Sequence, residues 1–133
     1  MALNPKTSIV GRNAALDACF NLLNSGFIRI YDGTQPTDAD TALGAQVLLA
    51  TLAFGSTAFA AASAASKTAN AITSGTAVAT STATWARLVK SDGTTVVHDM
   101  SVGLATSNLI LNDVAITTGG VVAVTSLVIS QAA

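Results

Sequence analysis

The run ATWARLVKSDGTTVVHDM, Ala83–Met100, gives the clearest indication of the fold class. It contains two segments rich in β-branched and aromatic residues, which are typical of strands. Ser91, Asp92 and Gly93 separate these segments, and Gly93 can adopt the positive φ that a tight hairpin turn requires. The run therefore predicts an antiparallel β-hairpin.

The chain after Ala69 has the same strand character throughout. Short segments rich in Val, Ile, Thr and Leu alternate with turn signals at the spacing of a sandwich or barrel. LILNDVAIT (Leu109–Thr117) and VVAVTSLVIS (Val121–Ser130) predict a second hairpin, joined through Gly119 and Gly120. We therefore expect a mainly β fold, either an antiparallel β-sandwich or a partly closed barrel.

One N-terminal α-helix is expected before the strands, from Val10 to Asn24. Thr7 or Ser8 can cap its start, and Gly26 lies just past its end. Apolar residues recur within it at intervals of three and four, which predicts one face that packs against a sheet. The members of this predicted face are Ala14, Ala15, Ala18, Cys19, Leu22 and Leu23.

Two strands are predicted between the helix and the C-terminal half. FIRIY, Phe27–Tyr31, has strand character and is stopped by Asp32 and Gly33. QVLLATLAF, Gln46–Phe54, is largely apolar at both odd and even positions. Such a strand is expected to be covered on both faces.

The Ala/Ser-rich segment 55–68 is ambiguous between a short helix and an irregular arm. Alanine favours a helix, whereas the repeated Ser, Thr and Gly compete with it. We interpret it as an extended arm that crosses a neighbouring subunit. The 133 residues fit one domain, with residues 1–25 as N-terminal arm and helix and residues 26–133 as the β domain.

The composition restricts the possible functions. Charged residues make up 10% of the chain, against about 25% in typical proteins, and apolar residues make up 50%. So little charge is typical of surfaces that membranes, fibres or neighbouring subunits cover. The net charge is −1 and the cations are scattered singly, which disfavours nucleic-acid binding because phosphates require clustered cations.

Signals for metals, secretion and membranes are missing from the sequence. Cys19 is the only cysteine, and no Cys/His cluster has metal-ligand spacing. The N-terminus lacks the features of a secretory signal, so synthesis in the cytoplasm is expected. Residues 41–66 are uncharged and long enough to span a bilayer, but their Gln, Ser, Thr and Gly argue against a membrane helix. We expect no membrane partner, no metal and no cofactor.

Two residue types could suggest catalysis. His98 precedes Asp99, and a carboxylate can orient an imidazole base. Adjacent strand residues point to opposite faces, however, and no activated nucleophile accompanies the pair. Cys19 lies on the apolar helix face, where free cysteine usually packs as a small hydrophobe. We therefore expect no catalytic residue, and place His98 on a surface hairpin.

Trp85 and the loop TQPTDADTALG (Thr34–Gly44) are the main candidates for contacts. The single tryptophan is interpreted either as a core anchor or as an interface hot spot. Pro36, Asp38 and Asp40 predict an exposed loop. The two aspartates resemble part of a calcium loop, but the glycine and glutamate that complete an EF-hand are missing.

RIYDGTQPTDADTALGAQVLLATLAF, followed by ATWARLVKSDGTTVVHDMSVG and LILNDVAITTGGVVAVTSLVIS, resembles a group of small virion structural proteins of tailed bacteriophages. The resemblance covers residues 26–130, and its most specific motifs are YDGTQP at Tyr31–Pro36 and WxRLVxSDGT at Trp85–Thr94. These motifs are structural, so no catalytic residue is implied. Members of the group look like head-associated proteins. The resemblance alone does not separate decoration of the head from a neck or tail position.

The sequence and the resemblance together predict a non-enzymatic capsid decoration or cement subunit located in the virion. Its expected partners are the major capsid protein, other virion proteins and further copies of itself. A neck or tail subunit is the alternative, and a small carbohydrate- or surface-binding module is a third hypothesis that would need more exposed aromatic residues. The expected interface residues are Asp32, Thr34, Gln35, Pro36, Asp38, Phe59 and Trp85.

Overall fold

The computed structural model describes residues 4–130 and contains one α-helix and twelve short strands in that range. The helix α1 spans Ile9–Phe20 and continues as a 3₁₀ turn, Asn21–Leu23. The strands are β1 Phe27–Tyr31, β2 Leu48–Phe54, β3 Ser66–Thr68, β4 Ile72–Thr73, β5 Gly75–Thr76, β6 Ser81–Thr82, β7 Trp85–Val89, β8 Val96–Gly103, β9 Leu109–Leu111, β10 Ala115–Ile116, β11 Val121–Val122 and β12 Val124–Ser130.

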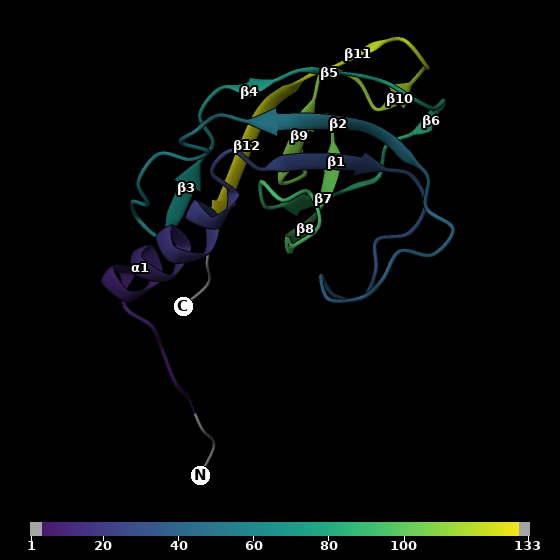
Figure 1. Ribbon diagram of the computed structural model, residues 1–133. Coiled ribbons are helices and arrows are strands. Elements are labelled where there is room, and N and C mark those ends of the chain that lie inside the picture. The colour runs from purple at the N-terminus through teal and green to yellow at the C-terminus, as the bar shows by residue number, and fades with distance from the viewer. Residues whose placement is uncertain (1–3, 131–133) are drawn as a thin grey trace.

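Eight of these strands form one curled sheet in the order β3-β12-β9-β8-β7-β1-β2-β4. The sheet makes a half-barrel, with α1 at the end next to β3 and the small pairs β6–β10 and β5–β11 at the opposite end (Figure 1). The mainly β fold with one N-terminal helix is thus confirmed. Pairing is antiparallel throughout this sheet except between β8 and β9, which are parallel.

The predicted helix is present, but a different face is buried. Ser8 is the N-cap and its Oγ accepts a hydrogen bond from the Gly11 amide at 3.2 Å. The buried side chains of the helical segment are Leu16, Phe20 and Leu23, spaced four and three residues apart. The predicted face was wrong because Ala14, Ala15, Ala18 and Leu22 are exposed, whereas Cys19 and Leu23 do pack against the core. Large side chains, which gain most from burial, decide the orientation of this alanine-rich helix.

The hairpin β7–β8 forms as predicted. Lys90 and Thr95 close the turn through a hydrogen bond of 2.9 Å, and Gly93 has a φ of +75°. The carboxylate of Asp92 accepts hydrogen bonds from the backbone amides of Thr94 and Thr95, both at 2.9 Å. The Thr95 hydroxyl also donates to the Asp92 carboxylate, and this bond, together with the two amide bonds, holds the pKa of Asp92 well below its usual range.

The second predicted hairpin is only partly correct. A turn does form before Gly120, whose amide donates to the Thr117 carbonyl at 2.8 Å. The strands on either side of it do not pair with each other, because β10 pairs with β6 and β11 pairs with β5. Antiparallel pairing between the two predicted segments occurs farther out, between β9 and β12.

The strand β7 is buried on both faces of the sheet. Ala86 and Leu88 join the main core, which lies inside the half-barrel together with Ile28 and Ile30 of β1. Trp85 and Arg87 lie on the opposite face, under the loop that joins β1 to β2. The strand β2 was expected to be covered on both faces, but its central Thr51 is exposed.

The segment 55–68 does not extend away from the domain as an arm. Polar side chains of the helical region accept hydrogen bonds from its backbone amides: Asn24 from Ala58, Asp17 from Ala62 and Asn13 from Ala65, each at 2.9 Å. Residues Ala58, Phe59, Ala65 and Lys67 are buried. The segment therefore packs against α1 of its own chain, which corrects the expected crossing to a neighbour.

Candidate functional site

The loop Asp32–Val47, which includes most of the interface residues expected from sequence, is held by its own polar groups. The Asp32 carboxylate accepts a hydrogen bond from the Val47 amide at 2.7 Å, and the Asp32 amide donates to the Val47 carbonyl at 3.2 Å. Gln46 crosses the loop, donating from Nε2 to the Thr34 carbonyl at 2.7 Å and accepting from the Gly44 amide at 2.6 Å. These bonds give a long, exposed loop a defined shape.

A buried polar and aromatic cluster supports the loop from below. Trp85 stacks on Tyr31 with ring centroids 4.8 Å apart, and its Nε1 donates to the Asp32 carbonyl at 3.0 Å. Arg87 makes two hydrogen bonds to Asp99, at 2.8 and 2.9 Å, and a third to the Thr41 carbonyl at 2.8 Å. The Arg87 guanidinium also lies 5.4 Å from the centre of the Trp85 ring. The loop therefore rests on a rigid base.

The loop residues that sequence reasoning selected differ in their exposure. Thr34, Gln35 and Asp38 are exposed, and Pro36 is half-buried. Asp32 is already engaged, because the Val47 amide and the Ser81 side chain bond its carboxylate and lower its pKa. The exposed members, rather than Asp32, can contact a partner through their side chains.

Trp85 and Phe59 lie inside the domain rather than on its surface. Their exposed fractions are 1% and 2%. Phe59 packs between Phe20 and Phe54, with ring centroids 5.4 and 5.5 Å away. Of the two interpretations of Trp85, the structure places it as the core anchor. Neither side chain offers surface to a partner in this conformation.

Asp38 and Asp40 form a turn and not a cluster of ligands. Asp38 Oδ1 accepts hydrogen bonds from the Asp40 amide at 3.1 Å and from the Thr41 hydroxyl at 2.8 Å. Within residues 4–130, no group of three or more His, Cys or Asp side chains is placed to hold a metal ion.

His98 and Asp99 point to opposite sides of β8, as their adjacency predicted. Asp99 is bonded to Arg87 under the loop, whereas the His98 ring packs edge-on against Phe20, with centroids 5.2 Å apart. Burial lowers the pKa of His98, against a smaller opposing effect of the Asp99 charge. Cys19 packs against the core as expected, and burial raises its pKa.

An exposed apolar end lies at the β5–β11 side of the molecule and was not predicted from sequence. Val78 and Val121 are 65% and 64% exposed. Val121 lies opposite Thr76 in the register of β5 and β11, and Val78 follows Ala77, whose amide donates to the Gly120 carbonyl at 2.8 Å, so both valines belong to this end of the molecule. We call these two residues the apolar end. Strands of two residues carry no periodicity, so no sequence signal could have found it.

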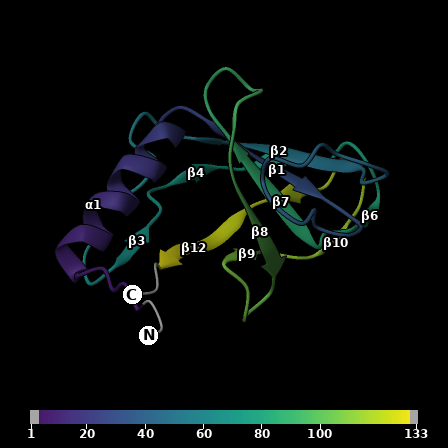
Figure 2. The same cartoon turned by 90° about the horizontal axis from the view of Figure 1, so that it is seen from below.

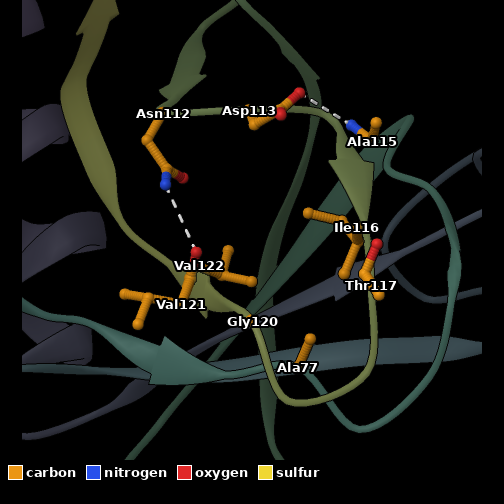
Figure 3. Close-up of a pocket in the computed structure, with 9 residues that line it drawn as sticks. All are labelled: Ala77, Asn112, Asp113, Ala115, Ile116, Thr117, Gly120, Val121 and Val122. Carbon is orange, nitrogen blue, oxygen red and sulfur yellow. Dashed lines mark hydrogen bonds between the residues drawn. The ribbon is translucent and has the colours of Figure 1, made fainter.

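A hollow of about 200 Å³ opens beside Val121 (Figure 3). The Asn112 side chain spans its mouth by donating to the Val121 carbonyl at 3.2 Å, and Asp113 accepts from the Ala115 amide at 3.0 Å. The remaining lining residues are Ala77, Ile116, Thr117, Gly120 and Val122. The polar side chains at the rim are thus bonded within the loop, and the lining offers mainly apolar contact.

The surface as a whole has few charges and many apolar side chains. The chain has six Lys and Arg and seven Asp residues, and four of these thirteen form the ion pairs Asp17–Lys67 and Arg87–Asp99. Nine charged side chains remain for other contacts. As many large hydrophobic side chains are exposed among the described residues: Ile9, Val10, Leu22, Leu43, Val47, Val78, Leu104, Val121 and Val128.

Comparison with known proteins finds no matching family model, no matching curated protein and no matching solved structure. Among residues 4–130, no helix is long and apolar enough to cross a bilayer.

Proposed function

We propose that this chain is a non-enzymatic structural subunit of a bacteriophage virion that decorates the outside of the capsid lattice. The observation that carries the proposal is the surface of a chain with only 10% charged residues, on which nine large hydrophobic side chains are exposed among residues 4–130. Exposed apolar side chains on a weakly charged surface suit contact with other proteins. The resemblance of residues 26–130 to small virion proteins supports the virion as the place of that contact.

In this proposal the subunit stabilises the capsid by burying area against it without forming covalent bonds. Two surfaces suit that task. The loop Asp32–Val47 presents exposed Thr34, Gln35 and Asp38 on a rigid base, and the apolar end presents Val78 and Val121. Pre-ordered surfaces lose little conformational entropy when they bind, so more of the contact energy contributes to affinity.

The direct test is the copy number of the chain in purified particles of the virus that encodes it. Quantitative mass spectrometry would compare it with the major capsid protein. A ratio near one, or a simple fraction of it, supports lattice-wide decoration. A few to a few tens of copies would move the chain to the neck or tail, and its absence from particles would overturn the structural role.

The apolar end gives a second, residue-level test. We expect the double variant Val78→Asp, Val121→Asp to fold normally, because both side chains are exposed, and to lose at least about tenfold in binding to particles that lack the chain. Ala61→Asp, also at an exposed position, is the control and should bind normally. Circular dichroism would verify folding, and co-sedimentation would measure binding. Equal binding of the double variant and wild type would remove the apolar end from the interface.

A further inference from the structure

The strand β12 changes partners along its length. Its C-terminal half pairs with β3 in the register Val128↔Thr68 and Ile129↔Lys67, and its N-terminal half pairs with β9. The last contact on the β3 side is the hydrogen bond from the Ala69 amide to the Leu127 carbonyl, at 3.0 Å. If this register continued, the next three residues, 70–72, would lie opposite residues 126–124 in reverse order.

The segment that follows β3 and the strand β12 separate at this point instead. The Asn70 amide donates to the Ala58 carbonyl at 2.9 Å, and its side chain donates to the Thr57 carbonyl at 3.0 Å. Ile72 then pairs with Phe54 of β2, on the other edge of the sheet. The segment that carries β3 and β4 therefore runs beside β12 and joins the two edges of the half-barrel without closing the ladder between them (Figure 2).

Where the two segments separate, they leave a hollow of about 200 Å³ between them. It is lined by Ala69–Ile72 on one side and Val124–Leu127 on the other. We call it the seam. Its lining residues are those that would pair if the register of β3 and β12 continued, so the seam is the space left by a missing stretch of β-ladder.

We infer that the seam binds an extended, uncharged peptide segment of another protein as an added strand. Within the described part of the chain, β12 has partners only in β3 and β9, so the main chain of Val124–Ser126 is paired on one side alone. An open strand edge presents backbone N–H and C=O groups that another extended main chain can satisfy. This recognition needs no particular side chain.

The lining indicates the chemistry of that segment. All eight lining residues are uncharged, and most are small or β-branched: Ala69, Asn70, Ala71, Ile72, Val124, Thr125, Ser126 and Leu127. A charged side chain placed in the seam would lose hydration without gaining a partner. The bound segment should therefore carry small, uncharged side chains.

A second copy of this chain is a poor source of the segment. Among residues 4–130, the extended segment that leaves the domain without strand pairing is Asn4–Thr7, at the N-terminal end (Figure 1). It contains Lys6, whose charge the seam cannot pair, and Pro5, which has no amide to donate. A different protein is therefore the expected partner. Binding to the seam does not depend on the proposed virion role and is tested on the isolated protein.

The test is a titration of the ¹⁵N-labelled protein with a blocked peptide, acetyl-Ala-Thr-Val-Thr-Ala-amide, followed by NMR. We expect dose-dependent shifts at millimolar peptide, centred on Val124–Leu127 and Ala69–Ile72, with slower amide exchange at the β12 positions that face the seam. A peptide with both Thr replaced by Pro is the matched control. It should not bind, because it lacks two main-chain donors.

A blocking variant separates the seam from other surfaces. Ala71→Phe fills the hollow from an exposed position and should abolish the shifts, whereas Ala61→Phe, exposed but outside the seam, should leave them unchanged. The inference would be overturned by shifts that are absent, that lie elsewhere, or that the proline peptide reproduces. If the seam binds peptide but the chain is missing from virus particles, only the proposed function fails.

Discussion

At the scale of single residues, Arg87 and Asp99 form an ion pair in which both charged side chains are buried. The side chains are 7% and 3% exposed, and Arg87 Nε lies 2.8 Å from Asp99 Oδ1. The Asp99 bond is also the largest cause that raises the pKa of Arg87. Two buried charges are stable only while both are present, since each repays the desolvation of the other.

We predict that Arg87→Met destabilises the protein by about 3 kcal/mol, because it leaves the Asp99 carboxylate buried without a cation. The double variant Arg87→Met, Asp99→Leu should recover most of the loss, since an apolar pair needs no desolvation. Arg29→Met, on the neighbouring strand β1 opposite Arg87, is the control and should change stability by less than about 1 kcal/mol. Urea unfolding curves would measure all three. A double variant no better than the single one would contradict the ion-pair argument.

His98 makes a separate prediction about pH. Burial against Phe20 lowers its folded-state pKa below the unfolded value of about 6.5, so the unfolded chain binds the proton more readily. Stability should therefore be complete above about pH 6.5 and fall as the pH is lowered from that value towards the folded pKa. His98 is the only histidine, which leaves this window free of other side chains with ordinary pKa values.

Urea unfolding at several pH values between about 5 and 7.5 would measure the effect, a range that spans the histidine pKa and avoids ordinary carboxylates. His98→Gln should make the free energy of unfolding independent of pH in this range. A wild-type protein whose stability rises on acidification would show that the fold favours the charged imidazole, contrary to the packing against Phe20.

At the scale of elements, hydrogen bonds and one ion pair attach the segment 55–68 to the helical region. Lys67 is buried, and its Nζ lies 2.6 Å from Asp17 Oδ1, an oxygen that also accepts from the Ala62 amide. Asp17 itself is partly exposed, at 39% of its side chain. The two side chains therefore differ in their access to water. Water can replace the Lys67 ammonium as a partner of Asp17, but water cannot reach the ammonium of Lys67.

This inequality predicts that Asp17→Ala costs more stability than Lys67→Met. The first change leaves a buried ammonium and a backbone amide without partners, whereas the second replaces the ammonium by an apolar side chain of similar length and should stay within about 1 kcal/mol of wild type. Hydrogen exchange should also become faster at Ala62 in Asp17→Ala. Equal losses in both variants would show that the pair acts as a symmetric unit.

The same elements show what sequence reasoning could reach. The β7–β8 hairpin was predictable because its turn signal, Gly93, lies between the strands that pair. The turn near Gly119 was equally visible, but its flanking strands pair with β5 and β6, about forty positions away, and no local signal selects such partners. The loop at Thr34–Gly44 was predicted as exposed, yet the burial of Trp85 and Arg87 beneath it depends on Asp99, Thr41 and Asp32, which only the folded sheet brings together.

At the scale of the whole molecule, stability depends on pairings between distant parts of the chain. The central strands β1 and β7 pair from Phe27↔Val89 to Tyr31↔Trp85, and Trp85 bonds a carbonyl 53 positions away, that of Asp32. Loops of this length must close before the contacts that stabilise them can form. Folding should therefore be limited by chain topology rather than by local helix or hairpin formation.

Trp85 provides the measurement. It is the only tryptophan, it is buried, and it stacks on Tyr31, so its fluorescence reports the β1–β7 pairing and not the local hairpin. We predict refolding after urea dilution in roughly milliseconds to seconds, the range of β proteins rich in non-local contacts, with the same rate by fluorescence and by far-UV circular dichroism. A fluorescence change in microseconds would mean that Trp85 becomes buried before β1 arrives, against the view that the sheet assembles as one cooperative unit.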